Sequence, residues 1–158
     1  MQSILSGNHI IEITALLHQT RYAMVRAREQ ELRPLGISNI EAATLFSIIA
    51  IGNEATPAEI SRWVFREPHS VSRLISRMEK DGLVTKSSNL ARKNLVKVDV
   101  TEKGLRVFKK SKRWKSYKKI LSVLSEEEFV QLRVLLDKLL GKALIEIGKN
   151  RPPFPPRP

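Results

Sequence analysis

The chain has 158 residues, of which 42% are hydrophobic and 28% charged, so its size and composition fit one folded domain with a core of its own. It contains no cysteine, which excludes disulfides, thiolate metal sites, cysteine nucleophiles and thiol redox sensing. No run of about 18 apolar residues is present, and the first residues lack the charged start and apolar block of a secretory signal. We therefore expect a cytoplasmic protein with no membrane partner.

The positive charge is concentrated in one central block. The chain carries 28 Lys and Arg against 16 Asp and Glu, a formal net charge of +12. Residues 62–119 hold 18 basic and five acidic side chains, whereas the other 100 residues hold 10 basic and 11 acidic ones. A localised basic block indicates a polyanionic partner, most commonly nucleic acid. A solvated basic face without a partner is the alternative.

Helical periodicity and capping residues predict most of the helices. Apolar side chains at helical spacing, with no Gly or Pro between them, predict a long helix over 8–32. Three capping boxes predict further helices over 38–51, 57–64 and 126–147. The boxes pair Ser38 with Glu41, Thr56 with Glu59 and Ser125 with Glu128.

The middle of the chain predicts a helix followed by a hairpin. Pro68 and Gly82 bound a helix over 68–81, and two strands follow over 83–86 and 95–100. In the second strand Val96, Val98 and Val100 alternate with polar residues, which is typical of a half-buried strand. Thr101 then caps a helix that we expect to continue to about residue 123.

This order of elements predicts a mainly α fold with a small β-hairpin. A short helix, a tight turn and a second helix form a helix-turn-helix, and the basic hairpin after it forms a wing. The architecture is a winged helix-turn-helix with long N- and C-terminal helices, in one domain over 1–148. The last residues, 149–158, contain five prolines and predict a disordered or polyproline tail.

The helix over 68–81 is the candidate DNA-recognition element. Its apolar residues (Val71, Leu74, Ile75 and Met78) form one stripe, and the opposite face is polar and basic without an acid. Arginine can bond guanine O6 and N7 in the major groove, and serine can contact bases or phosphates. An ordinary amphipathic surface helix is the alternative. The candidate DNA contacts are His69, Ser70, Ser72, Arg73, Ser76, Arg77 and Lys80.

The hairpin supplies a second set of candidate DNA contacts, namely Lys86, Arg92, Lys93 and Asn94. Long cations at a hairpin tip can enter the negatively polarised minor groove or bind phosphate. A solvated turn is the alternative.

Residues 106–119 form a further basic segment whose role the sequence leaves open. Its eight cations surround the predicted helix, and Phe108, Trp114 and Tyr117 do not share one stripe. Phosphate contact, contact with an acidic partner and simple solubilisation all fit this pattern.

No catalytic or metal-binding constellation is present in the sequence. His9, His18 and His69 lack metal-ligand spacing, and there is no Gly-rich phosphate loop or nucleophile elbow. We therefore expect neither an enzyme nor a bound metal or cofactor.

Four segments, in their order and spacing, resemble the MarR (multiple antibiotic resistance regulator) family of transcriptional regulators over roughly residues 10–147. The segments are LRPLGIS at 32–38, ATPAEI at 55–60, VSRLISRMEKDGLV at 71–84 and VTEKG at 100–104.

The resemblance implies a homodimer whose interface is formed by helices within 8–33 and 105–147. It places the DNA-binding lobe at 38–104, the recognition helix at 68–81 and the wing at 83–100. It also implies a double-stranded, pseudo-palindromic operator, usually bound by a repressor, and release by a small, commonly aromatic effector.

The wing departs from the family pattern. Family wings carry an Asp and an Arg two residues apart, and Arg92 and Asn94 occupy those positions here. Arg92 or Lys93 can replace the displaced arginine. The cysteine of peroxide-sensing relatives is absent, which excludes that branch.

The leading hypothesis is therefore a sequence-specific, ligand-responsive transcription factor. A non-specific nucleic-acid-binding or architectural protein would use the same basic block. Specific binding exceeds non-specific binding by about 10³ or more, so footprinting separates the two.

Overall fold

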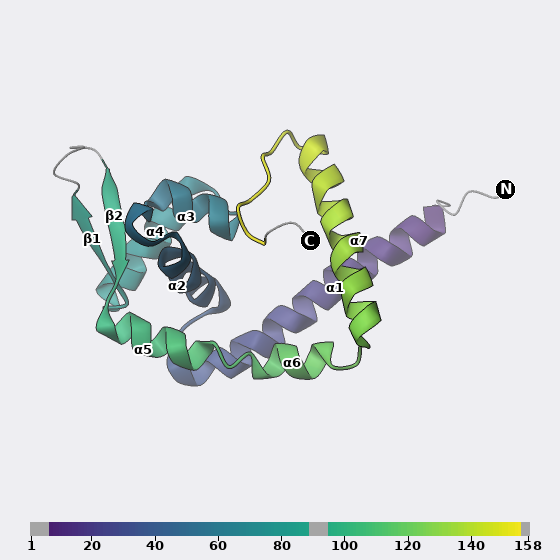
Figure 1. The fold of residues 1–158 in the computed structure, drawn as a ribbon, viewed down its shortest axis with the longest axis horizontal. Helices are drawn as coiled ribbons and strands as arrows, with labels where there is room; N and C mark the ends of the chain where they lie inside the picture. Colours follow the sequence, from purple (N-terminus) through teal and green to yellow (C-terminus); the bar gives the residue numbers. More distant parts are fainter. Residues whose placement is uncertain (1–6, 89–94, 156–158) are drawn as a thin grey trace.

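The computed structural model of the chain describes residues 7–88 and 95–155 and has the winged-helix architecture expected from the sequence (Figure 1). Helices and strands follow one another in the predicted order. They are α1 (Gly7–Leu32), α2 (Asn39–Ile51), α3 (Pro57–Val64), α4 (Pro68–Lys80), β1 (Val84–Ser88), β2 (Val96–Val100), α5 (Glu102–Ser111), α6 (Lys115–Leu121) and α7 (Glu126–Glu146). Single-turn 3-10 helices, Arg33–Leu35 and Gly52–Glu54, follow α1 and α2.

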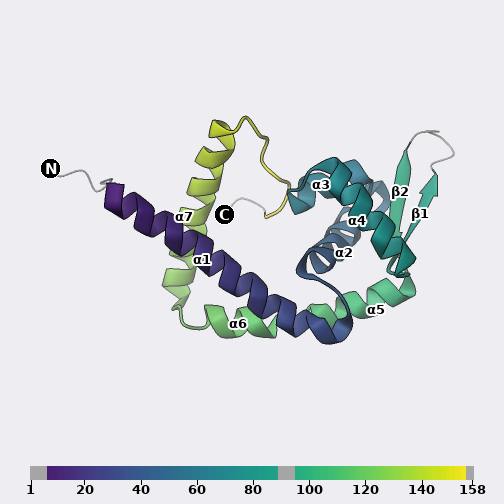
Figure 2. The ribbon, with the colours of Figure 1, turned by 180° about the vertical axis from the view of Figure 1, so that it is seen from behind.

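The elements form two regions, which we call the lobe and the arm. The lobe contains α2, α3, α4, the hairpin and α5, and the arm contains α1, α6 and α7 (Figure 1). Seen from behind, α1 crosses in front of α7, and α4 lies on the near side of the lobe (Figure 2). No single helix in the described part of the chain is long and apolar enough to cross a membrane.

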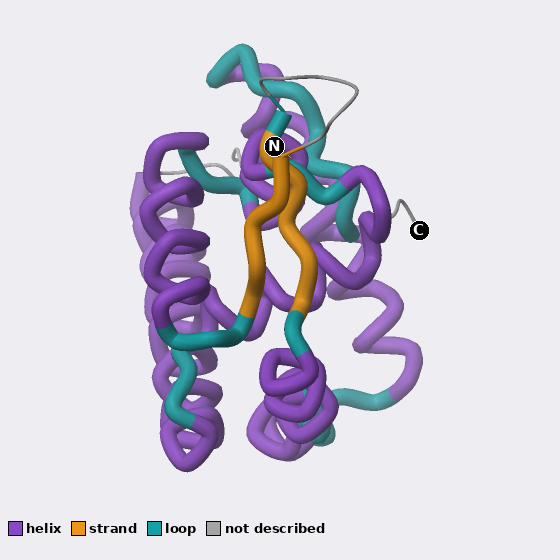
Figure 3. The backbone as a smooth tube through the Cα atoms, turned by 90° about the vertical axis from the view of Figure 1, so that its left-hand side faces the viewer, coloured by secondary structure: helices purple, strands orange, loops and turns teal. Residues whose placement is uncertain are grey.

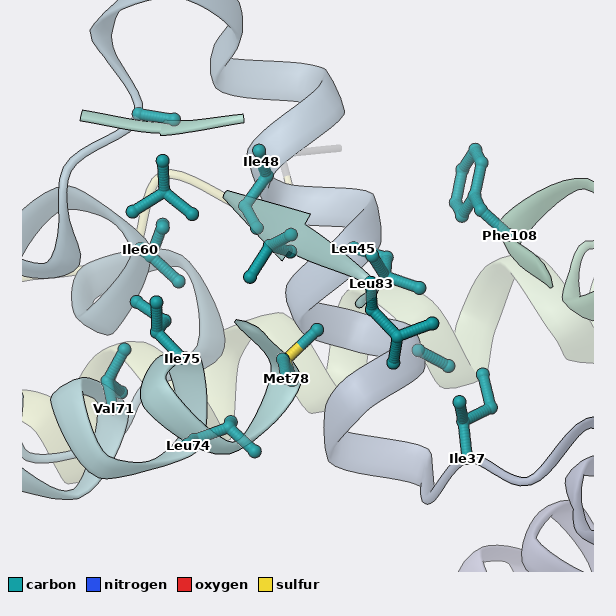
Figure 4. Close-up of a cluster of buried hydrophobic side chains, with 14 of the residues drawn as sticks. Ile37, Leu45, Ile48, Ile60, Val71, Leu74, Ile75, Met78, Leu83 and Phe108 are labelled. Carbon is teal, nitrogen blue, oxygen red and sulfur yellow. The ribbon is translucent and has the colours of Figure 1, made fainter. Parts of the chain in front are cut away.

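The core of the lobe is made by the apolar faces of its helices and hairpin (Figure 4). Leu45 from α2, Ile60 from α3 and Ile75 from α4 are completely buried there. The apolar stripe predicted for α4 is confirmed, because Val71, Leu74, Ile75 and Met78 are all buried.

Capping residues start the helices where the sequence predicts. Ser38 begins α2 with a complete capping box, in which its backbone N–H donates to Glu41 and its hydroxyl accepts from the Glu41 N–H. Ser125 and Glu128 form the same box at α7. At α3 the Thr56 hydroxyl accepts from the Glu59 N–H, and the Glu59 carboxylate pairs with Arg62 at 2.9 Å.

The hairpin is antiparallel, with Val84 opposite Val100 and Ser88 opposite Val96 (Figure 3). Its first strand starts one residue later and ends two residues later than expected. Val98 is fully buried, and its N–H donates to the Ala55 carbonyl at 2.8 Å, which fixes the wing to the segment between α2 and α3. Val96 was expected on the buried face but is 39% exposed, since it lies towards the open end of the hairpin.

The turn from α4 into the hairpin packs tightly against α5. Gly82 has a φ of +71°, so the predicted left-handed position after α4 is confirmed. The Thr101 hydroxyl donates to the Gly82 carbonyl at 2.7 Å. A Cβ atom on Gly104 would lie 2.1 Å from the Leu83 carbonyl oxygen, so only glycine allows this close approach.

The prediction of one helix from Thr101 to about residue 123 is wrong. The chain breaks between α5 and α6, where Trp114 has a left-handed φ of +52°. The cause is distant in sequence: the Glu31 carboxylate on α1 accepts from the N–H groups of Lys115 and Ser116 at 2.9 and 3.0 Å. It thereby caps the start of α6.

The break also separates the three aromatic residues that shared no stripe. The Phe108 side chain lies in the core of the lobe, and its exposed fraction is 8%. Trp114 and Tyr117 instead stack on each other at 5.7 Å beside α1.

Residues 149–155, expected to belong to a disordered or polyproline tail, contact both α7 and the lobe. After Gly148, at φ +61°, the chain turns back from α7 towards the lobe (Figure 1). Phe154 packs on Phe46 and Trp63, and Arg151 pairs with Asp137. These contacts involve side chains far apart in sequence, which the composition of the tail does not reveal.

Candidate nucleic-acid interface

The polar face of α4 is solvent-exposed. Most predicted DNA contacts on α4 are exposed, and Ser76 is half-buried. Five of them, Ser72, Arg73, Ser76, Arg77 and Lys80, line one surface groove. The structure therefore brings these five residues together on one face of α4. The helix itself lies on the near side of the lobe in Figure 2. The contact of these residues with DNA remains a prediction.

Three residues of this face are unengaged within residues 7–88 and 95–155. The side chains of His69, Arg73 and Lys80 form no hydrogen bond or ion pair with another residue of these ranges. Arg73 lies in the N-terminal half of α4 and Lys80 is its last residue. Both cations are therefore available to an anionic or hydrogen-bonding partner.

The two central serines are partly committed to the helix itself. Ser72 donates to the Pro68 carbonyl and Ser76 to the Ser72 carbonyl, each at 3.0 Å. Because a hydroxyl keeps acceptor lone pairs when it donates, both oxygens can still accept hydrogen bonds from a base amino group.

Arg77 is held by an acid that the sequence of α4 does not reveal. Its Nη2 lies 3.2 Å from Oε1 of Glu41, whose side chain is 9% exposed. Glu41 thus caps α2 with one oxygen and orients Arg77 with the other. The face of α4 has no acid of its own, but α2 supplies one at its edge.

Lys86 is the predicted wing contact that the structure describes. Its Nζ lies 2.9 Å from Oε2 of Glu79 and 3.1 Å from the Ser76 hydroxyl, so it ties β1 to α4. The hydrogen bond from Lys86 lowers the pKa of the Glu79 carboxyl. Arg92, Lys93 and Asn94 lie outside the described residues, and their role stays a prediction.

A buried arginine joins the lobe to the arm, and sequence reasoning missed it. Arg28 on α1 is 0% exposed. Its Nη2 donates to the Ser111 carbonyl at 2.6 Å, its Nη1 lies 3.1 Å from Glu31, and its guanidinium lies 4.2 Å from the centre of the Trp114 ring. Its Nε and Nη1 have no hydrogen bond to another described residue, so the Trp114 ring and the Glu31 charge compensate for its burial. The only sequence signal is a cation on a long helix.

Glu31 on α1 also stabilises this junction, because its carboxylate accepts hydrogen bonds from the start of α6. Burial alone would raise the pKa of the Glu31 carboxyl, but hydrogen bonds from Ser116 and Lys115, together with the adjacent Arg28 guanidinium, outweigh it and lower the pKa to about 2. Glu31 is therefore a carboxylate at neutral pH and holds α6 against α1.

The arm presents two features that bear on partners and effectors. Apolar side chains on α1 and α7 are widely exposed, among them Ile11 at 66% and Leu135 at 57%. An apolar cavity of about 280 Å³ lies against α7 and the tail, lined in part by Leu132, Leu136 and Pro155. Among the described residues, no group of three His, Asp or Glu side chains could hold a metal ion.

Comparison with known proteins gives a consistent set of relatives. The profile of the MarR family matches residues 35–93. The organohalide-sensing transcriptional regulator RdhR-CbdbA1625, bound to 2,4-dichlorophenol, is 32% identical with a TM-score of 0.82, and the match covers 95% of this chain and 90% of that one. No curated protein matches the chain by sequence.

Two DNA complexes share the fold at lower identity. A mutant MarR from E. coli, complexed with operator DNA, is 24% identical over 84% of this chain and 96% of its own, with a TM-score of 0.78. The S. aureus MepR–DNA complex is 23% identical over 82% of this chain and 96% of its own, with a TM-score of 0.75.

Proposed function

The chain belongs to the MarR family of transcriptional regulators, and from this premise we propose that it is a homodimeric repressor that binds a pseudo-palindromic operator and is released by a small ligand. In this proposal α4 is the recognition helix and the hairpin is the wing.

The observation that carries the proposal is the face of α4. Its apolar stripe is fully committed to the lobe, while Arg73, Lys80 and their neighbours line an exposed groove. A helix with buried apolar residues and exposed cations and hydroxyls has the chemistry to read base edges in a major groove. Lys86 and Arg77 frame this face in fixed positions because each is paired with a carboxylate.

The exposed arm supports the homodimer. Apolar patches of more than a few hundred Å² usually mark an interface, and α1 and α7 each expose several large apolar side chains. A two-fold dimer would present two α4 helices to half-sites about one helical turn apart, which accounts for a pseudo-palindromic operator.

The apolar cavity beside α7 supports a small effector. It lies next to the tail that reaches the lobe, so an occupant there can favour one lobe position over another. The relative that binds 2,4-dichlorophenol makes an aromatic effector the first choice for testing. Because the chain has no cysteine, the effector acts without thiol chemistry.

Footprinting on the DNA next to the protein's own gene tests the proposal. We expect two protected segments about one helical turn apart, with affinity at least about 10³ above that for random DNA. Uniform protection with equal affinity for random DNA would instead identify a non-specific or architectural protein. Transcription from the same promoter should rise when the protein is removed, and a fall would contradict the repressor role.

A further inference from the structure

The surface of the lobe that faces the tail carries an aromatic corner, formed by Phe46 of α2 and Trp63 of α3. Their ring centroids are 6.3 Å apart and their planes are inclined by 58°. The Phe154 ring occupies this corner, stacked on Trp63 at 6.0 Å with a 7° interplanar angle and edge-on to Phe46 at 5.1 Å. Stacked and edge-to-face arrangements are the two favourable geometries for aromatic pairs.

The ring of Phe154 is held mainly by these two contacts. It is still 43% exposed, and the corner beneath it is only half-buried. Without Phe154, the faces of Phe46 and Trp63 would be open to water on the side that faces the tail. The corner is thus a preformed binding site for one aromatic ring, and the Phe154 ring that fills it can leave.

The tail links this seat to both regions of the molecule. Arg151 pairs with Asp137 on α7, and both side chains are largely buried. Lys149 lies 3.3 Å from Glu67, the residue that immediately precedes α4. The same segment lines the apolar cavity through Arg151 and Pro155. A change at the corner is therefore transmitted to α7 and to the start of the recognition helix.

We propose that the aromatic corner is a binding site for a small planar aromatic molecule, and that Phe154 fills it until such a ligand displaces the tail. The inference rests on the proposed function, because it offers the aromatic corner, in place of the cavity beside α7, as the site of the effector. The tail acts as an internal competitor, since its ring and a ligand ring cannot stack on Trp63 together. Displacement breaks the contacts of the tail, so that Lys149 no longer pairs with Glu67 before α4 and Arg151 no longer pairs with Asp137 on α7.

Calorimetric titration of the full-length protein with 2,4-dichlorophenol as the probe tests this site. Removing the competing ring should expose the corner, so Phe154→Ala should bind the probe roughly tenfold more tightly than the unmodified chain. Added to Phe154→Ala, where no ring competes, Trp63→Leu should weaken binding by roughly tenfold or more, while Trp63→Phe, which keeps a ring, should retain most of it. Phe65→Leu removes an exposed aromatic residue of the same lobe outside the corner and should leave the affinity unchanged.

Two results would overturn the inference. One is equal affinity, or no binding, in the unmodified and Phe154→Ala proteins. The other is affinity that stays unchanged when Trp63→Leu is added to Phe154→Ala, which would place the probe elsewhere, such as in the cavity beside α7. Operator binding without the probe is measured for every variant. If the unmodified protein footprints its operator but the titrations fail, the aromatic corner is not the ligand site and the proposed function stands. If the unmodified protein footprints no operator, the proposed function itself is contradicted.

Discussion

The lobe and the arm differ in how far their large apolar side chains are exposed to solvent. In the lobe, the large side chains of α4 that point inward are buried at 9% exposure or less. In the arm, α7 buries only Leu144, while Leu135 and Leu139 are 57% and 52% exposed. The lobe therefore completes its own core, whereas the arm leaves apolar surface that a second chain can cover.

Polar substitutions in the apolar face of the arm should have the largest effect. The double variant Leu135→Glu/Leu139→Glu should leave the lobe folded and prevent dimer formation, because two carboxylates would be buried in the interface. Operator affinity should fall by about 10² to 10⁴, since the two half-sites are no longer bound together. Gel-shift titration measures this loss.

A control is Leu105→Glu, which adds one carboxylate at an exposed position of α5, in the lobe. It should leave dimerisation intact. Operator affinity of the double variant equal to that of the unmodified chain would contradict the role of the arm.

The junction between the two regions should be the next most sensitive point. Arg28→Leu removes the buried guanidinium between Ser111, Glu31 and Trp114 and should lower the free energy of unfolding by about 3 kcal/mol. Chemical denaturation measures the change. Arg26→Ala breaks an exposed pair with Glu29 and should cost about 0.5 kcal/mol or less. Equal effects of the two substitutions would show that the junction is unimportant.

On the exposed side of the lobe, Arg73 and Lys80 should separate base reading from phosphate binding. Arg73→Ala should cost about 1–3 kcal/mol at one operator base pair and relax specificity there. Lys80→Ala should weaken all sequences alike and reduce the salt slope by about 1. Titrations on operator and random DNA at several salt concentrations distinguish them. If both variants lose the same affinity on operator and on random DNA, Arg73 does not read a base.

The wing should make a smaller, shape-dependent contribution. Arg92→Ala/Lys93→Ala should reduce the salt slope by up to about 2 and lose most affinity on operators with A·T-rich flanks, where the narrow minor groove attracts cations. The comparison uses A·T-flanked and G·C-flanked versions of one operator. A salt slope and flank preference like those of the unmodified chain would indicate a solvated hairpin tip.

The smallest expected effect is the pH response of the junction. The pKa of Glu31 is lowered to about 2 in the folded protein, against 4.5 as the ordinary value. Its contribution to stability is therefore complete above about pH 4.5 and is lost as the pH falls towards 2. Glu31→Gln should flatten this part of the stability–pH profile, measured by thermal unfolding between pH 2 and 6. A profile unchanged by the substitution would contradict the assignment.

Local signals in the sequence predicted the lobe well. Capping at Ser38 and Thr56, the stripe from Val71 to Met78 and the glycine at position 82 each act through neighbours in the chain, so the sequence alone predicts them. The candidate DNA-binding residues of α4 could be collected on one face for the same reason.

The misjudged features depend on residues distant in sequence. The Glu31 carboxylate binds the start of α6 from 84 residues away in sequence. Glu41 pairs with Arg77 across 36 residues, and the Phe154 ring stacks on Trp63. No local propensity encodes such pairs, because each is created by the packing of α1, α2 and the tail around the lobe. Prediction from the sequence therefore succeeded on elements and faces and failed where side chains meet across elements.

Sedimentation equilibrium of the full-length protein at micromolar concentration tests the central claim most directly, namely that the arm is the interface of a dimer carrying two recognition helices. The expected result, in the absence of DNA, is a species of twice the chain mass of 18.0 kDa. A stable species of 18.0 kDa at this concentration would contradict it, because the apolar faces of α1 and α7 would then be exposed to water without a partner.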